Sequence, residues 1–433
     1  MAIFNFRPGL RLALIGAVAA IALGACATPI PTLVGGGETA TASSARALHE
    51  RLLIMDTHLD TPANFSSADF SLIGAQTFAE GGTQVDLPRM IEGGLDGGFW
   101  VIYTEQGELT EAAYRAARDH ALIRAGEIRE AAARHHDRFE LAFASEDAAR
   151  IAASGKRVMY QSMENAYPLG RDISMLETFY KFGLRMVGPV HFANNQFADS
   201  ATDPVGQRWN GLSGQGRELV QEANRLGIVL DGSHAHDKAV YDMIGLSKTP
   251  LILSHTGVKA VYDHPRNIDD ALLKRLAETG GVIQINAFSG YLEELVQTPE
   301  RLVAIAKIEA WLDGADPEAL EGELLISFRE QAERLNRDFP PNRSSFEKFA
   351  EHLLHALEVV GPDHVGIGAD WDGGGGVGGM EDIVSLPRIT ALLLDKGYSE
   401  DDIAKIWSGN MLRVLKAAED AATADITSLP IVR

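Results

Sequence analysis

Cysteine is almost absent from this sequence, because Cys26 is the single cysteine among 433 residues. An intramolecular disulfide is therefore excluded, and the fold must rest on its apolar core and on any bound metal. Positive charge is also scarce: 39 lysines and arginines stand against 60 aspartates and glutamates, for a formal net charge of −21. This excess argues against nucleic acids and anionic membrane surfaces as electrostatic partners. It does not restrict a small substrate, since the charge of a site can differ in sign from the net charge.

One long apolar run, LALIGAVAAIALGA at residues 12–25, follows two arginines and ends in small residues. This pattern is typical of a secretory signal. The run leads into LGAC, which resembles a bacterial lipobox, in which the cysteine is lipidated and becomes the new N-terminus. We therefore expect residues 1–25 to be a lipoprotein signal peptide and Cys26 to be lipidated. A signal cut before Cys26 that leaves a free thiol is the alternative.

The residues that follow the lipobox predict how the protein is placed in the cell. Residues 26–44 are rich in glycine, proline, serine and threonine, which predicts a flexible tether. Ala27, rather than an aspartate, follows the cysteine, and this favours sorting to the outer membrane of a Gram-negative bacterium over retention in the inner membrane. We expect a lipid-anchored protein of the bacterial cell envelope that faces the periplasm.

Beyond the tether, short apolar runs of β-type residues alternate with segments of helical composition. Strands that alternate with helices predict a parallel sheet. Eight such units predict an α/β fold of the (β/α)8 TIM-barrel type over residues 45–420, and residues 421–433 are expected to be a C-terminal tail. A run at residues 139–144 suggests an accessory ninth strand. The eight runs lie at residues 52–56, 99–103, 157–163, 184–190, 228–233, 251–255, 281–286 and 365–370.

The longest gap between runs separates strands seven and eight and predicts a helical insertion. Residues 323–339 and 344–361 have helical composition on either side of two consecutive prolines. Ser345 has the residue type and position of an N-cap for the second helix. We expect both helices to lie on the rim of the barrel.

Histidines and acids recur where the apolar runs end. Catalytic groups of a (β/α)8 barrel lie at the carboxyl ends of its strands, so these side chains are predicted to meet at one face. A histidine at one strand end is more often structural, but several histidines and acids at successive ends favour a shared site. The residues in question are His58, Asp60, Glu164, His191, His234, His255, Asp370 and Asp372.

Part of this set has the composition of a site for two divalent metal ions. Three imidazoles and one carboxylate are offered by His58, Asp60, His234 and His255. Glu164 adds a carboxylate whose two oxygens can bridge two ions. Two ions roughly 3.5 Å apart share one water, lower its pKa and hold it for attack on a carbonyl. Nitrogen and oxygen ligands without thiolate fit zinc best, although cobalt or manganese suits the same ligands.

Five motifs resemble those of the membrane (renal-type) dipeptidases of the amidohydrolase superfamily. They are DTHLD, DGSHAHD, LILSHTGVKAVYDHPRN, GIGADWDG and SGNMLRVL, and the similarity spans roughly residues 48–418. The 21-residue step from His234 to His255 and the 11-residue step from His255 to Arg266 match the family's spacing. The resemblance implies a (β/α)8 metallohydrolase that cleaves dipeptides.

The resemblance also implies a role for each matching residue. His58 and Asp60 match the ligands of one zinc, His234 and His255 match those of the other, and Glu164 matches the bridge between them.

Three further residues match substrate-binding and catalytic positions of the family. His191 matches a residue that contacts the scissile carbonyl, Arg266 one that binds the substrate's carboxylate, and Asp370 one that handles the proton. We therefore expect a binuclear zinc dipeptidase in which a metal-bridging hydroxide attacks dipeptides that carry a free C-terminal carboxylate. The sequence does not decide whether the protein forms a homodimer.

The chain departs from the family pattern at three places. Gly232 stands in DGSH where many relatives have a β-branched residue, which is expected to loosen that strand end. Asn165 and Ala166 follow Glu164 where many relatives have glycine, so the sequence does not predict the shape of the pocket there. The polar ending TADITSLPIVR differs from the C-terminal lipid-anchor signal of animal relatives, which leaves Cys26 as the predicted anchor.

Two other functions are kept as alternatives. The first is another amide or ester hydrolase of the superfamily, such as a deaminase or a lactone or phosphotriester hydrolase. Many of these begin with His-x-His and bridge their metals with a carboxylated lysine, whereas this chain has His-x-Asp and a glutamate, with Lys181 the lysine near the relevant strand ends. The second is a lipoprotein that binds a peptide without turnover, and it predicts lost ligands.

Overall fold

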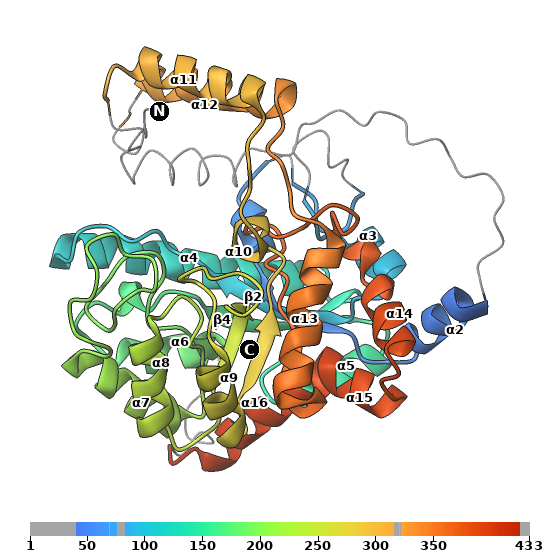
Figure 1. Ribbon diagram of the computed structural model, residues 1–433. Helices are drawn as coiled ribbons and strands as arrows, with labels where there is room; N and C mark the ends of the chain where they lie inside the picture. Colours follow the sequence, from blue (N-terminus) through green and yellow to red (C-terminus); the bar gives the residue numbers. More distant parts are fainter. Residues whose placement is uncertain (1–39, 69, 76–82, 316–319, 321, 425–433) are drawn as a thin grey trace.

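The computed structural model describes residues 40–68, 70–75, 83–315, 320 and 322–424 (Figure 1). The predicted signal peptide, Cys26 and most of the predicted C-terminal tail lie outside the described residues. Within the part of the chain that is described, no helix is both long and apolar enough to cross a membrane.

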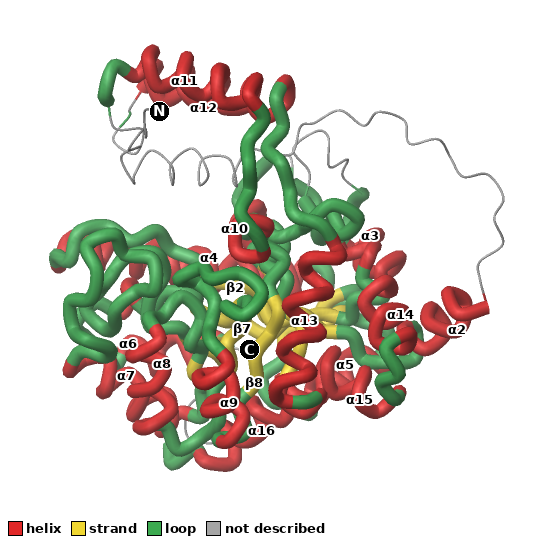
Figure 2. The backbone as a smooth tube through the Cα atoms, in the orientation of Figure 1, coloured by secondary structure: helices red, strands yellow, loops and turns green. Residues whose placement is uncertain are grey.

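The strands form two parallel sheets at the centre of the molecule (Figure 2). Every pairing between neighbouring strands is parallel, so the predicted α/β fold with a parallel sheet is confirmed. The first sheet has the order β1 (Met55–Leu59), β2 (Gly97–Ile102), β4 (Arg157–Met163), β5 (Leu184–Val187) and β6 (Val229–Leu230), with β3 (Phe139–Leu141) paired to β4. The second sheet has the order β7 (Ile252–Thr256), β8 (Val282–Ile285) and β9 (Val365–Ile367).

The two sheets are joined at both edges. An isolated parallel bridge links Asp231, after β6, to Ile252 of β7, and a second links Leu59 of β1 to Trp371, after β9. One buried cluster also draws residues from seven strands: it contains Met55 of β1 and Val282 of β8, together with residues of α16 (Asn410–Ala421) such as Val414. The sheets therefore curl around a common interior that α16 covers at one end.

Helices surround the strands, and side-chain caps define where several of them begin. Ser213 accepts a hydrogen bond from the backbone N–H of Gly216 at the start of α7, and Gly227 ends this helix with φ of 76°. Such a left-handed residue is favourable only for glycine or asparagine. The helices around the sheets are α2 (Ala40–His49), α3 (Leu87–Gly93), α4 (Glu111–Arg134), α5 (Asp147–Ala153), α6 (Met175–Phe182), α7 (Gly214–Leu226), α8 (Asp237–Leu246), α9 (Asp270–Glu278), α13 (Phe346–Val360), α14 (Pro387–Asp395), α15 (Glu400–Ala404) and α16.

Between β8 and β9 the chain leaves the body of the molecule and returns. After the short α10 (Ser289–Leu292), the helices α11 (Pro299–Leu312) and α12 (Gly322–Asp338) project from the body as a helical arm (Figure 1). The arm packs on an apolar cluster of its own that includes Leu312 and Phe328. It is therefore separate from the main core.

Three sequence expectations differ from the structure. Helix α13, capped by Ser345 as predicted, does not lie on the rim: it packs on α9, β8 and β9 and buries Phe349 and Leu353. Strand β1 begins at Met55, three residues later than expected. Its pairing with β2 starts at Met55, opposite Gly97, so Leu52 and Leu53 precede the strand. Helix α2 begins inside the predicted tether, because its buried Ala45 and Leu48 pack the helix against the body.

Candidate metal centre

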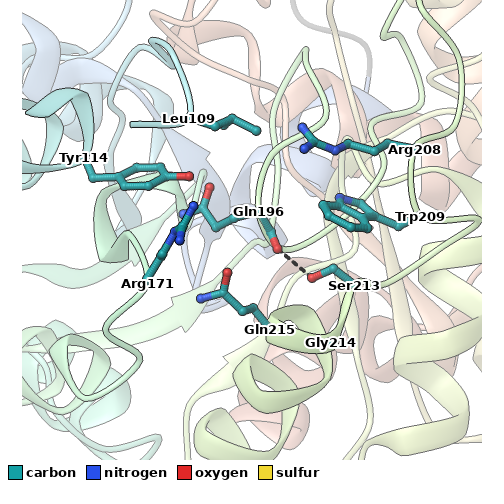
Figure 3. Close-up of a pocket in the computed structure, with 9 residues that line it drawn as sticks. All are labelled: Leu109, Tyr114, Arg171, Gln196, Arg208, Trp209, Ser213, Gly214 and Gln215. Carbon is teal, nitrogen blue, oxygen red and sulfur yellow. Dashed lines mark hydrogen bonds between the residues drawn. The ribbon is translucent and has the colours of Figure 1, made fainter. Parts of the chain in front are cut away.

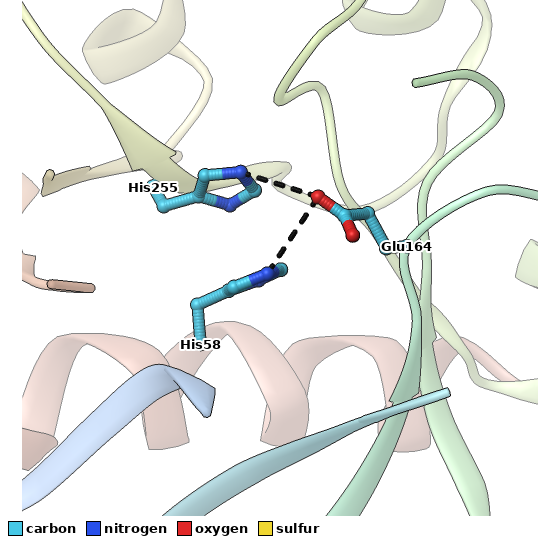
Figure 4. A group of neighbouring side chains, drawn as sticks. All are labelled: His58, Glu164 and His255. Carbon is cyan, nitrogen blue, oxygen red and sulfur yellow. Dashed lines mark ion pairs between the residues drawn. The ribbon is translucent and has the colours of Figure 1, made fainter. Parts of the chain in front are cut away.

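Four histidine side chains surround one carboxylate oxygen. Glu164 follows β4, and its Oε1 lies 3.1 Å from His234 Nε2 and 3.4 Å from His255 Nε2. His58 Nε2 and His191 Nε2 each lie 3.6 Å from the same oxygen. Figure 4 shows the rings of His58 and His255 on one side of the Glu164 carboxylate, with their centroids 3.8 Å apart. The chain thus places nitrogens from strands of both sheets around a single glutamate.

Two aspartates complete the cluster beside His58. Asp60 Oδ2 lies 3.2 Å from His58 Nε2. His58, Asp60 and Asp370 each place a potential ligand atom within 4.8 Å of the other two. The same limit holds for the trio of Glu164, His191 and His234 and for the trio of His58, Glu164 and His255. The predicted ligands are therefore brought together, while their roles as ligands stay a prediction.

Strained backbone holds two members of the cluster in place. His234 has φ of 65° and Asp370 has φ of 64°, in the left-handed region that non-glycine residues rarely adopt. Such strain persists only where the surrounding structure fixes the conformation, and it is common at functional sites. Both residues turn the chain sharply after a strand, which directs the His234 side chain to Glu164 and the Asp370 side chain to His58 and Asp60.

Gly373 closes the wall behind the two aspartates and was not identified from the sequence. A Cβ at this position would lie 2.0 Å from Asp60 Oδ2 and 2.3 Å from Asp370 Oδ1. No side chain fits there unless a carboxylate moves. The glycine run GGGG after ADWD was the available signal, but a glycine run alone does not indicate which glycine faces a carboxylate.

Asp372 is not part of the cluster, although it follows the same strand. Its carboxylate accepts hydrogen bonds from the Thr61 hydroxyl at 2.7 Å, from the Gln84 backbone N–H at 2.6 Å and from the Thr83 hydroxyl. It therefore ties the segments that follow β1 and precede α3 to the end of β9. Its role is structural.

Burial sets the protonation of the acids in the metal-free cluster. Burial, together with the neighbouring charge of Asp60, raises the pKa of Glu164 to about 8 and that of Asp370 to about 8. Burial alone would lower the pKa of His58, but the charges of Asp60 and Glu164 outweigh it and raise this pKa to about 10. Three carboxyl groups thus lie around the His58 imidazole, an arrangement that suits cations.

The other three histidines are neutral and have the arrangement of metal ligands. Burial, reinforced by the positive charge of Arg266, holds the pKa of His191, His234 and His255 well below its usual range. His234 Nε2 and His255 Nε2 nevertheless lie only 2.8 Å apart. The Nδ1 of His58 has no hydrogen-bond partner among the described residues. Converging neutral imidazoles and carboxylates of this kind fit divalent cations, which need unprotonated nitrogen and oxygen donors.

Arg266 lies beneath the cluster and is almost fully buried. Its Nη2 donates to the backbone carbonyl of His255 at 2.9 Å, and its Nη1 donates to the Thr256 hydroxyl at 3.2 Å. Its Nε is buried and has no hydrogen-bond partner among the described residues. The guanidinium therefore keeps donors available, and the ring of Tyr291 lies 5.6 Å from its carbon.

Aromatic rings line the side of the cluster that carries His191. Phe192 packs on the His191 ring at a centroid distance of 3.8 Å, and Tyr103 meets the same ring edge-on at 5.1 Å. Sequence reasoning missed both residues. Tyr103 is the last residue of the apolar run at 99–103, and Phe192 directly follows His191. Aromatic residues in such positions are usually part of the core, so the pattern gave no distinguishing signal.

Two of the three departures from the family pattern, at Gly232 and after Glu164, have local explanations. A Cβ at Gly232 would lie 2.5 Å from Leu253 Cδ2, so Leu253 fills the space and the strand end is packed rather than loose. Asn165 accepts hydrogen bonds from the Tyr167 N–H and from the Asn195 side chain. It thereby connects the loop after Glu164 to the loop that carries His191.

A separate cavity of about 480 Å³ lies beside this second loop (Figure 3). Its described walls contain none of the predicted metal ligands; they include Tyr114, Arg171, Gln196, Arg208, Trp209 and Ser213. The Ser213 hydroxyl donates to the Gln196 carbonyl at 2.5 Å, and the Gln196 amide donates to the carbonyls of Tyr167 and Gly170. These bonds brace the loop between β5 and α7, which carries His191.

An α/β fold whose parallel strands carry imidazoles and carboxylates to one buried cluster is typical of metal-dependent hydrolases. The sequence model of the membrane dipeptidase family (peptidase family M19) matches residues 42–428. The chain therefore belongs to the membrane dipeptidase family and is a hydrolase of peptide bonds. This confirms the resemblance seen in its motifs.

Named relatives agree with this family. Over 353 residues the chain is 30% identical to dipeptidase tcpJ of Claviceps purpurea, an alignment that covers 80% of this chain and 72% of the relative. Among solved structures, the probable dipeptidase PvdM of Pseudomonas aeruginosa is 28% identical, with a TM-score of 0.76 and coverage of 88% and 99% of the two chains. A metallopeptidase of Rhodobacter sphaeroides, solved with a phosphinate mimic of the dipeptide L-Ala-D-Ala, is 25% identical, with a TM-score of 0.65 and coverage of 85% and 99%.

Proposed function

We propose that the protein is a binuclear zinc dipeptidase that hydrolyses dipeptides with a free C-terminal carboxylate. One observation carries the proposal: imidazole nitrogens of four histidines lie 3.1 to 3.6 Å from a single oxygen of Glu164 in a chain of the membrane dipeptidase family. Two cations that share Glu164 would explain why the imidazoles of His58, His234 and His255 converge on its carboxylate.

Five residues would hold the two ions. His58 and Asp60 would hold one, His234 and His255 the other, and Glu164 would bridge them. When bound, two divalent ions supply an activated water and polarise a carbonyl oxygen. Zinc suits this set of nitrogen and oxygen donors because no thiolate takes part.

Asp370 and His191 would handle protons and charge around the scissile bond. A buried carboxyl with a raised pKa is suited to take a proton from water and to pass it to the leaving amine. His191 is a neutral imidazole, so its ring N–H can donate a hydrogen bond to the carbonyl oxygen as negative charge develops there. Asp370 follows β9 and His191 follows β5, so the two groups reach the cluster from different strands.

Arg266 would bind the free carboxylate of the substrate. Its unpartnered Nε and the remaining N–H groups offer the paired donors that a carboxylate accepts. The bound dipeptide mimic of the Rhodobacter sphaeroides metallopeptidase supports a substrate of this length. Because that mimic has a D-residue at its C-terminal position, we include L,D-dipeptides among the substrates.

The fold and the location belong to the same proposal. The edge bridges and the shared interior cluster support one closed (β/α)8 barrel, with the helical arm inserted between its seventh and eighth strands. The lipobox motif supports lipidation at Cys26 and an envelope location that faces the periplasm. Relatives of this chain include bacterial and fungal proteins, so the location is argued from this N-terminus alone.

A dipeptide library tests the proposed function. The purified chain, loaded with zinc, is assayed on L,L- and L,D-dipeptides, on the matching tripeptides and on C-terminally amidated dipeptides. Hydrolysis confined to free dipeptides, and lost after chelation, is the expected result. Equal turnover of amidated dipeptides would favour a general amidase of the superfamily, and binding without turnover would favour a peptide-binding lipoprotein.

A further inference from the structure

A buried chain of hydrogen bonds ends at one predicted metal ligand. The Ser254 hydroxyl lies 2.9 Å from His255 Nδ1 and donates to Asp231 Oδ2 at 2.5 Å. The other oxygen of Asp231, Oδ1, accepts the backbone N–H groups of Ser233 and Ser254, each at 2.9 Å. Asp231, Ser254 and His255 are each at most 3% exposed. Water therefore does not compete for these bonds.

The geometry around Asp231 determines which group donates the proton in each hydrogen bond from Asp231 to His255. The contact with Asp231 Oδ2 at 2.5 Å is much shorter than the 3.4 Å contact with Ser233 Oγ, so the single proton of the Ser254 hydroxyl points to Asp231. The hydroxyl oxygen then turns a lone pair to His255, whose Nδ1 must carry the proton. A neutral imidazole has one N–H, so His255 Nε2 keeps its lone pair and faces Glu164 and His234.

The neighbouring ligands have no equivalent arrangement. Neither Nδ1 of His58 nor Nδ1 of His234 has a hydrogen-bond partner among the described residues. His255 is thus the histidine of this set whose tautomer the protein fixes before any ion binds.

We infer that Asp231 and Ser254 are positioning residues that hold His255 in the metal-binding tautomer, and that they set the affinity of the ion bound by His234 and His255. This inference rests on the proposed function, because it assigns that ion to these two histidines. Outer hydrogen-bond partners of metal-bound histidines typically change metal affinity by 10- to 100-fold when they are removed.

Replacing Asp231 with asparagine should reverse the direction of the hydrogen bonds from residue 231 to His255 rather than merely weaken them. The two backbone N–H groups at Oδ1 require the amide oxygen to take that position, which places the amide nitrogen opposite Ser254. The amide then donates to the hydroxyl, and the hydroxyl is left to donate to His255 Nδ1. His255 Nε2 would then carry the proton and oppose cation binding.

Chelator competition on the purified full chain, with zinc as the probe, measures the effect without substrate. Ser254→Ala should lower the affinity of one of the two ions by about 10-fold, and Asp231→Asn by about 100-fold, with the other ion affected little. The zinc affinity of the double variant Asp231→Asn/Ser254→Ala should equal that of Ser254→Ala. Without the Ser254 hydroxyl, the asparagine cannot force His255 into the wrong tautomer. Ser254→Cys, which keeps a weak donor in nearly the same volume, should be intermediate.

Ser233→Ala is the matched control. Ser233 is a buried neighbour whose hydroxyl accepts the His255 backbone N–H at 3.0 Å and lies 3.4 Å from Ser254 Oγ, but it does not contact the imidazole. It should retain the affinity of the parent for both ions. A loss as large as that of Ser254→Ala, or parental affinity in Asp231→Asn, would overturn the inference.

Nitrogen-15 spectra of the metal-free protein, labelled at histidine, report the tautomer directly. The signal that disappears in His255→Gln identifies the residue. The parent should show a protonated Nδ1, and Asp231→Asn a protonated Nε2; the same tautomer in both would overturn the inference. Failure of the proposed function is separable, because a parent that binds two zinc ions and cleaves no dipeptide would leave these measurements unchanged.

Discussion

At the scale of single residues, the pKa values of Glu164 and Asp370 differ strongly from those of ordinary surface acids. Burial raises the pKa of each to about 8 in the metal-free protein, against 4.5 and 3.8 for the exposed groups. Between about pH 5 and pH 8 the folded state therefore keeps protons that the unfolded state has lost. Stability falls with rising pH wherever the folded state binds more protons. His58, with its pKa raised to about 10, adds stability that is complete below pH 6.5 and is lost as the pH rises toward 10.

Between pH 6.5 and pH 8, Glu164, Asp370 and His58 thus all lower the stability of the metal-free protein as the pH rises. We predict that the melting temperature of the metal-free protein falls as the pH rises through this window, and that zinc reverses the fall, because binding displaces the protons. Scanning calorimetry at pH 6.5, 7 and 8 measures it. The double variant Glu164→Gln/Asp370→Asn should show a smaller fall, and a melting temperature that rises between pH 6.5 and pH 8 in the metal-free parent would contradict the assignment.

Arg266 carries the prediction that concerns substrate recognition. We predict that Arg266→Ala keeps both metal ions but lowers kcat/KM for free dipeptides by about 30- to 1,000-fold, because the substrate carboxylate loses a buried partner. Arg266→Lys should recover only part of this loss, since an ammonium cannot reproduce the paired donors of a guanidinium. Steady-state kinetics with metal analysis of each variant gives the result.

A C-terminally amidated dipeptide is the control for this substitution. It should be a poor substrate of the parent and should lose little more in Arg266→Ala, because the interaction is already absent. That non-additivity is the signature of a direct contact. Equal losses for the free and the amidated dipeptide would assign Arg266 to structural support of His255 instead.

At the scale of elements, the loop after β9 positions the aspartates of the cluster. We predict that Gly373→Ala lowers kcat/KM by roughly 100-fold or more while the protein stays folded, because the new Cβ must displace Asp60 or Asp370. Gly378→Ala is the matched control in the same loop: its Cβ would meet its nearest neighbour, the Ser344 carbonyl, at 3.4 Å and should be tolerated. Parental activity and metal content in Gly373→Ala would contradict this account.

The elements themselves could largely be predicted from the sequence. Each of the eight apolar runs contains or overlaps a strand, because a buried parallel strand needs a continuous run of β-type residues. The run at 139–144 contains β3, which pairs outside the ring on β4. The candidate ligands followed from position alone, since a histidine or acid at the end of such a run lies at the carboxyl edge of the sheet.

What the sequence could not supply depends on contacts between distant segments. The amphipathic pattern of α13 fits a helix of the body or of the rim, and only its packing on β8 and β9 decides between them. Helix α11 was missed, because its alanines and scattered apolar residues give no clear periodicity. The role of Gly373 depends on two carboxylates, one of which lies more than 300 positions away in the chain.

At the scale of the whole molecule, an acidic chain encloses a buried arginine that would attract the anionic end of a substrate. The net charge of −21 makes attraction to an anionic membrane surface unfavourable, so attachment would depend on a covalent lipid. We predict that Cys26→Ser releases the protein from membrane fractions and leaves its turnover unchanged once it is purified. Fractionation of cells that express each form, followed by a dipeptidase assay, measures both. A variant that still sediments with membranes would contradict lipidation at Cys26.

The central claim is that dipeptide hydrolysis depends on two divalent ions held around Glu164. Titrating the metal-free protein with zinc, while the hydrolysis of one free dipeptide is followed, tests this most directly. The account predicts that activity rises from near zero and reaches its plateau at two zinc ions per chain. A plateau at one ion per chain, or full activity before any zinc is added, would contradict it.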